Sequence, residues 1–203
     1  KTDLIGLTVA FAATLILGIE LGILVAVVAS MLVVFARMSM PHSAVLGRVD
    51  GTTSYRNLNR FPEARTIEGV HILRIDAALS FVNAVNVKKL ILAHADGIAE
   101  LPRALVLDAS GINDLDATGA EMLQEILEEM EDRKVALHLA DVKGPVRDVL
   151  RNAGIWDQMG TRIHSSTNDA VTAIAAGDPG PIDQRRHGID EQTANESAAP
   201  AHA

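Results

Sequence analysis

The most apolar stretch of the chain lies at its start, and its length restricts what it can form. Between Leu4 and Ala36 the only charged side chain is that of Glu20. A single helix over this stretch would be about 48 Å long, whereas the hydrocarbon core of a bilayer is about 30 Å thick. The pattern therefore predicts one or two transmembrane helices within residues 1–37, and it favours two with a break near residues 18–22.

A signal peptide and a buried soluble hairpin fit the apolar stretch less well than membrane helices do. A signal peptide has a shorter apolar region that follows a charged segment. A buried hairpin of a soluble protein would be unusually apolar. Arginines at positions 37, 48, 56 and 60 follow the second apolar segment, whereas only Lys1 precedes the first. The excess of positive charge on cytoplasmic flanks then predicts that everything after residue 37 is cytoplasmic.

Glu20 is the candidate polar residue within the membrane. It could face a substrate path or a neighbouring helix, as ionisable residues in membrane segments often do. It could also lie at the turn between two helices. Because Gly18 and Gly22 flank it and the length of the stretch requires a break there, the sequence favours the turn.

Residues 38–66 have no sustained period of apolar positions, and prolines and glycines interrupt them. This composition predicts a connector that follows the surface of a neighbouring domain. Four larger apolar side chains have the spacing of residues that contact such a surface: Leu46, Tyr55, Leu58 and Phe61.

Residues 67–177 alternate between short β-rich runs and amphipathic helical patterns, which predicts a mixed β-sheet covered by helices. The run at 104–108 is continuously apolar and is therefore expected to be a central strand. The other expected strands are 70–75, 79–82, 135–140 and a short one near 162–163. The expected helices are 84–95, 117–133, 146–152 and 168–176. Residues 178–203 hold almost no large apolar side chains, which predicts a disordered tail.

The charge balance and the residue types exclude several classes of function. A net charge of −8 without a basic, aromatic stripe argues against a nucleic-acid partner. The absence of cysteine excludes disulfides and thiol chemistry. The seven histidines form no closely spaced pair, and the acidic loop described next lacks the pattern of a calcium site, so no metal site is expected. No phosphate-binding or dinucleotide motif is present, and no cofactor is expected.

An acidic loop with glycines connects the expected central strand to the following helix. Its polar and small residues form the candidate regulatory or partner-contact loop: Asp108, Ser110, Asn113, Asp114, Asp116 and Gly119. Ser110 lies outside any nucleophile-elbow motif, and the sequence places no histidine as its base, so it is expected to form a turn. Asp116 is placed to cap the helix, and Asp114 adds charge that favours its start. The sequence therefore predicts a protein that is not an enzyme.

Thr118, at the start of the helix, is the candidate phospho-switch. A phosphate there would add about 1.5–2 negative charges beside Asp114 and Asp116, which could remodel the loop or its contact surface. The simpler interpretation is a small hydroxyl that fits at a helix start.

Several motifs together resemble known families. LDASGINDLDATGAEML is similar to the signature loop and helix of STAS domains, which sulfate transporters share with anti-sigma-factor antagonists. LGRVDGTTSYRNLNRFPEA resembles the segment before the STAS domain in SulP-family anion permeases, and TLILGIELGILVAVVASMLVVFAR resembles their last two membrane helices. RIDAALSFVNA and LADVKGPVRDVLRNAGI are similar to other STAS segments. In the antagonists the position that matches Thr118 is a phosphorylated serine.

The resemblance implies the C-terminal part of a secondary-active anion permease of the sulfate or bicarbonate class. It implies a multi-pass membrane location, a cytoplasmic STAS domain and no complete transport site in this chain. The implied partners are membrane lipid, the remainder of the permease membrane domain, a second copy in a homodimer and a regulatory protein at the STAS loop.

The alternative is a stand-alone, membrane-tethered STAS module that binds a protein such as a kinase. About 350 further residues of membrane helices upstream of Lys1 would indicate the permease. An initiator methionine directly before Lys1 would indicate the module.

Overall fold

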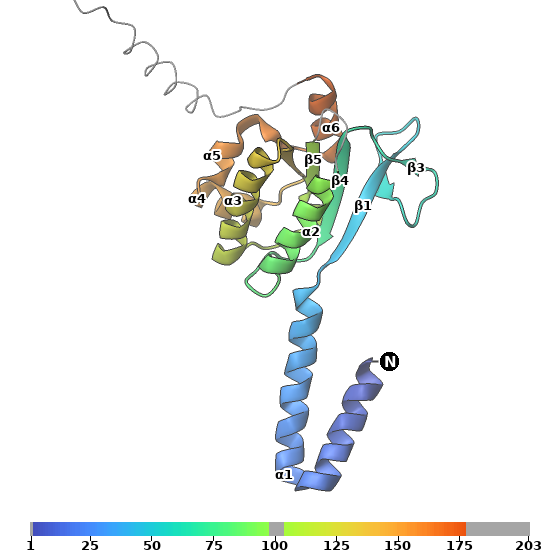
Figure 1. Ribbon diagram of the computed structural model, residues 1–203, viewed down its shortest axis with the longest axis vertical. Coiled ribbons are helices and arrows are strands. Elements are labelled where there is room, and N and C mark those ends of the chain that lie inside the picture. Colours follow the sequence, from blue (N-terminus) through green and yellow to red (C-terminus); the bar gives the residue numbers. More distant parts are fainter. Residues whose placement is uncertain (1, 98–103, 178–203) are drawn as a thin grey trace, which may run out of the picture.

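The computed structural model describes residues 2–97 and 104–177, and the expected disordered tail at 178–203 lies outside the described residues. An N-terminal helical hairpin leads into an α/β domain (Figure 1). The strands are β1 (His42–Val49), β2 (Tyr55–Asn57), β3 (Ala64–Arg65), β4 (Val70–Asp76), β5 (Ala104–Asp108), β6 (Ala136–Ala140) and β7 (Ile163–His164). The α-helices are α1 (Thr2–Ser39), α2 (Ala84–Asp96), α3 (Ala117–Asp132), α4 (Gly144–Asn152), α5 (Ile155–Met159) and α6 (Thr167–Ala175). Short 3₁₀ turns occupy Ala109–Gly111 and Gly160–Arg162.

The strands of the described residues form one mixed sheet in the order β2-β1-β4-β5-β6-β7, with β3 also paired to β1. β1 is antiparallel to its neighbours, whereas β4, β5, β6 and β7 run parallel. β5 lies between β4 and β6, and all five of its residues are buried. The prediction of a central strand at 104–108 is therefore confirmed.

Helices cover both faces of the sheet and enclose two apolar clusters. On one face α2, α3, α4 and α5 enclose an apolar cluster with β4, β5 and β6, and on the other face α6 packs on β5, β6 and β7. The buried residues of α3 include a stripe of large apolar side chains at helical spacing: Met122, Leu123, Ile126, Leu127 and Met130. The prediction of a mixed sheet covered by helices is confirmed. It rested on the spacing of apolar residues in the sequence, which differs between helices and strands.

Two sequence predictions within and before the domain are corrected. Residues 79–82 form no strand, and Leu79 makes only an isolated bridge to Leu115. The expected connector at 38–66 contains β1, β2 and β3, so it belongs to the sheet. Gly47, which looked like a chain breaker, lies inside β1, where a Cβ atom would come within 2.7 Å of the Arg65 carbonyl oxygen. The glycine therefore marks a close approach of two strands rather than an irregular segment.

The hairpin breaks where the sequence indicates. Gly18 has φ 82° and ψ 172°, which interrupts α1 and turns the chain back on itself (Figure 1). Only glycine adopts this backbone conformation easily. The segment Gly18–Ser39 has 22 residues, so it is about 33 Å long, and it is the one helix of the described residues long and apolar enough to cross a membrane. The preceding apolar segment, Gly6–Ile16, is shorter.

Candidate regulatory loop at the start of helix α3

The loop between β5 and α3 lies at the end of the domain that adjoins the hairpin. β1 begins at His42, just after the hairpin, and pairs His42 with Asp76 at the end of β4. β5 runs parallel to β4, so Asp108 at its end lies at the same edge of the sheet. At this edge the side chain of Asn86 on α2 donates a hydrogen bond to the carbonyl oxygen of Ser39, 2.8 Å away.

The first half of the loop is a tight turn organised by Asp108. Its buried carboxylate accepts a hydrogen bond from the Ser110 backbone N–H at 2.9 Å, while the Ser110 side chain is exposed. Ser110 lies within the 3₁₀ turn, as the sequence predicts, but the side chain that organises the turn is that of Asp108. At Gly111 a Cβ atom would lie 2.6 Å from a carboxylate oxygen of Asp76, so only glycine lets the loop pass this closely.

Asp116 joins two segments of the chain. One carboxylate oxygen accepts the Gly119 N–H at 2.7 Å, which caps α3 as the sequence predicts, and the other accepts the Phe81 N–H at 3.0 Å. Backbone hydrogen bonds between Leu79 and the loop, at 3.0 and 3.1 Å, strengthen the same connection. Since both carboxylate oxygens of Asp116 hold backbone groups, the geometry fits a structural role and does not resemble that of a catalytic base.

Gly119 and Thr118 lie next to each other but differ in their surroundings. Gly119 is buried, and a Cβ atom there would lie 2.6 Å from the Leu79 carbonyl oxygen and 2.8 Å from a Leu115 methyl group. Thr118 is exposed. The loop therefore fixes the start of α3 through Gly119 and presents the Thr118 hydroxyl to the outside.

Thr118 lines a hollow of about 420 Å³ between α2 and α3, together with Lys88 and Lys89. The Lys88 ammonium group bridges the two helices through Glu125 at 2.8 Å and Glu129 at 2.7 Å. Hydrogen bonds to these two carboxylates raise the pKa of Lys88. Cations of α2 therefore lie near Thr118 in addition to the aspartates that the sequence places beside it.

The remaining loop residues, Asn113 and Asp114, are exposed. The Lys143 ammonium group donates a hydrogen bond to the side-chain oxygen of Asn113, and Asp114 accepts the N–H of Leu115 at 2.9 Å. The structure thus brings every predicted loop residue to one end of the domain. The carboxylates stabilise the loop, whereas the side chains of Ser110, Asn113 and Thr118 remain exposed.

Asp141 is a residue of this edge that the sequence did not reveal. It follows β6 and lines a shallow hollow with Asp108, and its carboxylate accepts the Thr167 N–H at 3.2 Å. Burial raises the pKa of Asp141, and the charge of Asp108 adds to the effect. Asp108 is the last residue of β5, and Asp141 directly follows β6. Their position at the ends of two apolar parallel strands is the sequence signal that would have predicted their proximity. Within the described residues, three or more potential metal ligands never cluster.

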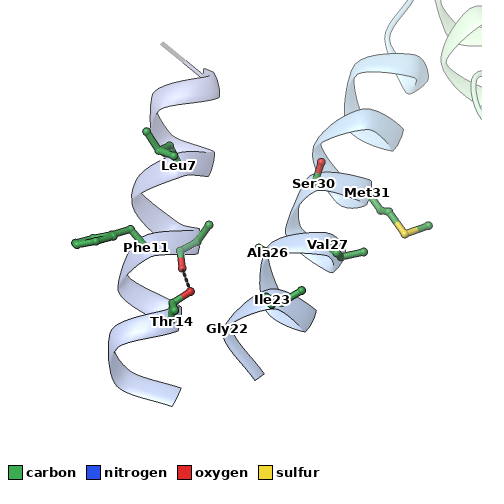
Figure 2. A pocket seen from close by; sticks show the side chains of 10 residues that line it. Leu7, Phe11, Thr14, Gly22, Ile23, Ala26, Val27, Ser30 and Met31 are labelled. Carbon is green, nitrogen blue, oxygen red and sulfur yellow. Dashed lines mark hydrogen bonds between the residues drawn. The ribbon is translucent and has the colours of Figure 1, made fainter. Parts of the chain in front are cut away.

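The structure places Glu20 beside the break at Gly18, at the end of the hairpin remote from the domain, with an exposed side chain. Next to it the two helices touch, because a Cβ atom on Gly22 would lie 2.5 Å from the Cα atom of Thr14. Figure 2 shows the two helices diverging from this contact, and residues of both helices line the hollow beside it.

Comparison with known proteins gives consistent relatives. Residues 61–170 match the family model described as STAS domain. Sulfate transporter 1.3 of Arabidopsis thaliana is 32% identical over 184 residues, which cover 86% of this chain and 28% of that protein. A probable sulfate transporter of Mycobacterium tuberculosis is 32% identical over 149 residues, covering 73% of this chain and 27% of that protein. This chain thus spans less than a third of the length of these relatives.

A solved structure of similar fold is the murine solute carrier 26 family member A9 anion transporter in its inward-facing state. Its TM-score is 0.74 at 24% identity, with 86% of this chain and 28% of that chain covered. The motifs of the loop, the mixed sheet and the family match all indicate a STAS domain. The chain belongs to the STAS domain family, and it fits the C-terminal STAS part of a SulP-family transporter.

Proposed function

We propose that the chain is the C-terminal part of a secondary-active inorganic anion transporter of the sulfate or bicarbonate class. The observation that carries the proposal is the similarity to sulfate transporters over 86% of the chain, which is more than the STAS match at residues 61–170 covers. The hairpin supplies the last membrane helices of a multi-pass permease, and the STAS domain lies in the cytoplasm. The rest of the membrane domain supplies the transport site.

The STAS domain regulates or dimerises the permease through the surface that adjoins the hairpin. The loop at Asp108 to Gly119 lies at this surface, and the Asn86–Ser39 hydrogen bond connects the same end of the domain to the membrane helix. Thr118 is the switch residue of the loop. A phosphate there would add charge beside Asp116 and across the hollow from Lys88 and Lys89, so it would rearrange the contacts between α2 and α3.

The test is anion uptake by the full-length permease with substitutions at Thr118. Thr118→Glu imitates the added negative charge and is expected to change the uptake rate or the binding of the regulatory partner several-fold. Thr118→Ala is expected to keep the behaviour of the unmodified protein. Because the side chain is exposed, both variants fold.

The matched control is Thr172, an exposed threonine on α6 whose hydroxyl bonds only to the Asn168 carbonyl within its own helix. Thr172→Glu is expected to leave uptake unchanged. Equal uptake and equal partner binding by Thr118→Glu and Thr118→Ala would rule out the switch, whereas an inactive wild-type permease would rule out the transport assignment.

A further inference from the structure

A cationic surface with an aromatic centre lies on α4 and α5, and its Lys143 reaches the acidic loop through a hydrogen bond to Asn113. Lys143, Arg147 and Arg151 are four residues apart, so they follow one face of α4. The guanidinium carbon of Arg147 lies 5.5 Å from the centre of the Trp156 ring, and that of Arg151 lies 4.9 Å from it. Contacts of this kind favour a cation over the ring face and hold both arginines near α5.

These two arginines differ from Lys88 and Arg133 of the same domain in lacking an ion-pair partner. Arg133 pairs with Asp96 at 2.9 Å and with Glu129 at 3.0 Å. In the described part of the chain, no carboxylate lies within 4.0 Å of the Arg147 or Arg151 guanidinium group. Within the described residues, the charges of Arg147 and Arg151 are therefore not neutralised by a direct ion pair.

Arg147 lines a hollow of about 470 Å³ beside β7, the edge strand of the sheet. The imidazole of His164 and the hydroxyl of Ser165 line it as well, together with the edge of Trp156. The His164 ring is held in place by its contact with the ring of His138, where the nitrogens are 3.0 Å apart. One Arg147 nitrogen donates a hydrogen bond to the Val142 carbonyl oxygen, 3.3 Å away, and the guanidinium group has further N–H donors. Together with the Ser165 hydroxyl, the hollow therefore offers several donors to one ligand.

One carboxylate, that of Asp141, also lines the hollow and opposes an anion there. Its hydrogen-bonding oxygen accepts both the N–H and the hydroxyl of Thr167, at 3.2 and 3.4 Å. It is therefore directed to the start of α6 and forms no ion pair with Arg147.

We propose that the hollow formed by Arg147, His164 and Ser165 binds a small tetrahedral oxyanion, of which sulfate and phosphate are the examples. A planar guanidinium group binds two oxygens of such an ion at once. Flat aromatic ligands fit less well, because two guanidinium groups already lie over the Trp156 ring. If the proposed transport function holds, cytosolic substrate would bind the STAS domain and regulate the permease. Binding itself does not depend on transport.

The experiment uses the fluorescence of Trp156, the only tryptophan of the chain, as a reporter inside the site. The full chain in detergent is titrated with sodium sulfate, sodium phosphate and, at matched ionic strength, sodium chloride. Equilibrium dialysis with labelled sulfate measures the same affinity without the fluorophore. The expected result is a saturable change with sulfate or phosphate and none with chloride.

Arg147→Gln is expected to weaken oxyanion binding at least tenfold, and Arg147→Lys, which keeps the charge but loses the planar fork, is expected to weaken it less. Arg60→Gln, at an exposed arginine before β3, is the matched control and should bind as the wild type does. A response to sulfate no greater than to chloride, or undiminished binding by Arg147→Gln, would overturn the site. Either result leaves the uptake assay of the permease unaffected, so the two proposals fail separately.

Discussion

The hairpin and the STAS domain are both rich in aliphatic residues, but the hairpin exposes many of these side chains whereas the domain buries them. In the hairpin Leu15 and Ile16 are 70% and 81% exposed. In the domain Leu105, Leu107 and their neighbours are completely buried. The sheet and its helices supply their own apolar interior, whereas the hairpin leaves its side chains to be covered by something else.

This difference in exposure indicates that the surface of the domain suits water, whereas the surface of the hairpin suits an apolar environment. Large exposed apolar surfaces are rare on soluble domains, and lipid or neighbouring membrane helices are the natural cover for a helix of this length. The hairpin therefore depends on its surroundings, whereas the domain depends on close internal contacts such as those at Gly119 and Gly111. Substitutions that disturb only the packing inside the domain, or only the surroundings of the hairpin, therefore test the two regions independently.

The largest effect is expected from Gly119→Val, which places methyl groups where a Cβ atom alone would lie 2.6 Å from the Leu79 carbonyl oxygen. We expect a loss of about 4 kcal/mol in the free energy of unfolding of the domain. Denaturant unfolding followed by Trp156 fluorescence measures it. Gly144→Val is the control, since a Cβ atom there meets no atom within 4 Å.

Gly22→Val tests the same comparison from the hairpin side. Its Cβ atom would come equally close to Thr14, so it should separate the two helices of the hairpin while leaving the unfolding of the domain unchanged. A loss of domain stability from Gly22→Val, or none from Gly119→Val, would contradict the separation of the two regions.

A smaller effect is expected from placing the same charge on exposed valines in the two regions. Val28 and Val85 are 48% and 65% exposed. Val28→Asp is expected to oppose membrane insertion by about 3 kcal/mol, because the residue lies near the middle of the spanning segment. Val85→Asp lies on the surface of the domain and should change its stability by less than about 0.5 kcal/mol. An insertion reporter that gives the inserted fraction compares them, and equal insertion of both variants would argue against a spanning helix.

The smallest effect is expected at Asp141, whose pKa is raised in the folded domain by burial and by Asp108. The ionised form is therefore disfavoured on folding, and protonation favours the folded state. Asp141→Asn removes the charge and should stabilise the domain by less than about 1 kcal/mol at neutral pH. Asparagine also tolerates the backbone angle of φ 56° at this position.

The pH dependence of this effect distinguishes the loss of a charge from a simple change in hydrogen bonding. The stabilisation by Asp141→Asn should shrink as the pH falls through the raised pKa of Asp141, because the wild-type carboxyl group is then neutral as well. Unfolding free energies of both proteins across the acidic range measure it. A difference that stays constant with pH would show that the charge is not its cause.

The sequence predicted those parts of the molecule in which local pattern and tertiary contact agree. The helical period placed the buried stripe of α3, the continuous apolar run placed β5 at the centre, and the length of the apolar stretch placed the break near Gly18. The capping role of Asp116 followed from its position before a helix. Each of these features depends on neighbours in the sequence.

The parts that the sequence missed depend on partners that are distant in the sequence. β1, β2 and β3 are held by pairing with one another and with β4, so the glycine and prolines of that segment gave a misleading signal. The second hydrogen bond of Asp116, to Phe81, crosses 35 positions. The proximity of Asp108 and Asp141 follows only once the order of the strands is known.

The central claim is that the hairpin crosses the membrane with its turn on the far side and the STAS loop on the cytoplasmic side. Because these 203 residues contain no cysteine, each single-cysteine variant adds one reactive thiol to them. The measurement is labelling of Glu20→Cys and Thr118→Cys in intact cells by a maleimide that does not cross membranes. The account predicts that Glu20→Cys is labelled from outside and that Thr118→Cys reacts only after permeabilisation. Labelling of both from the same side would contradict it.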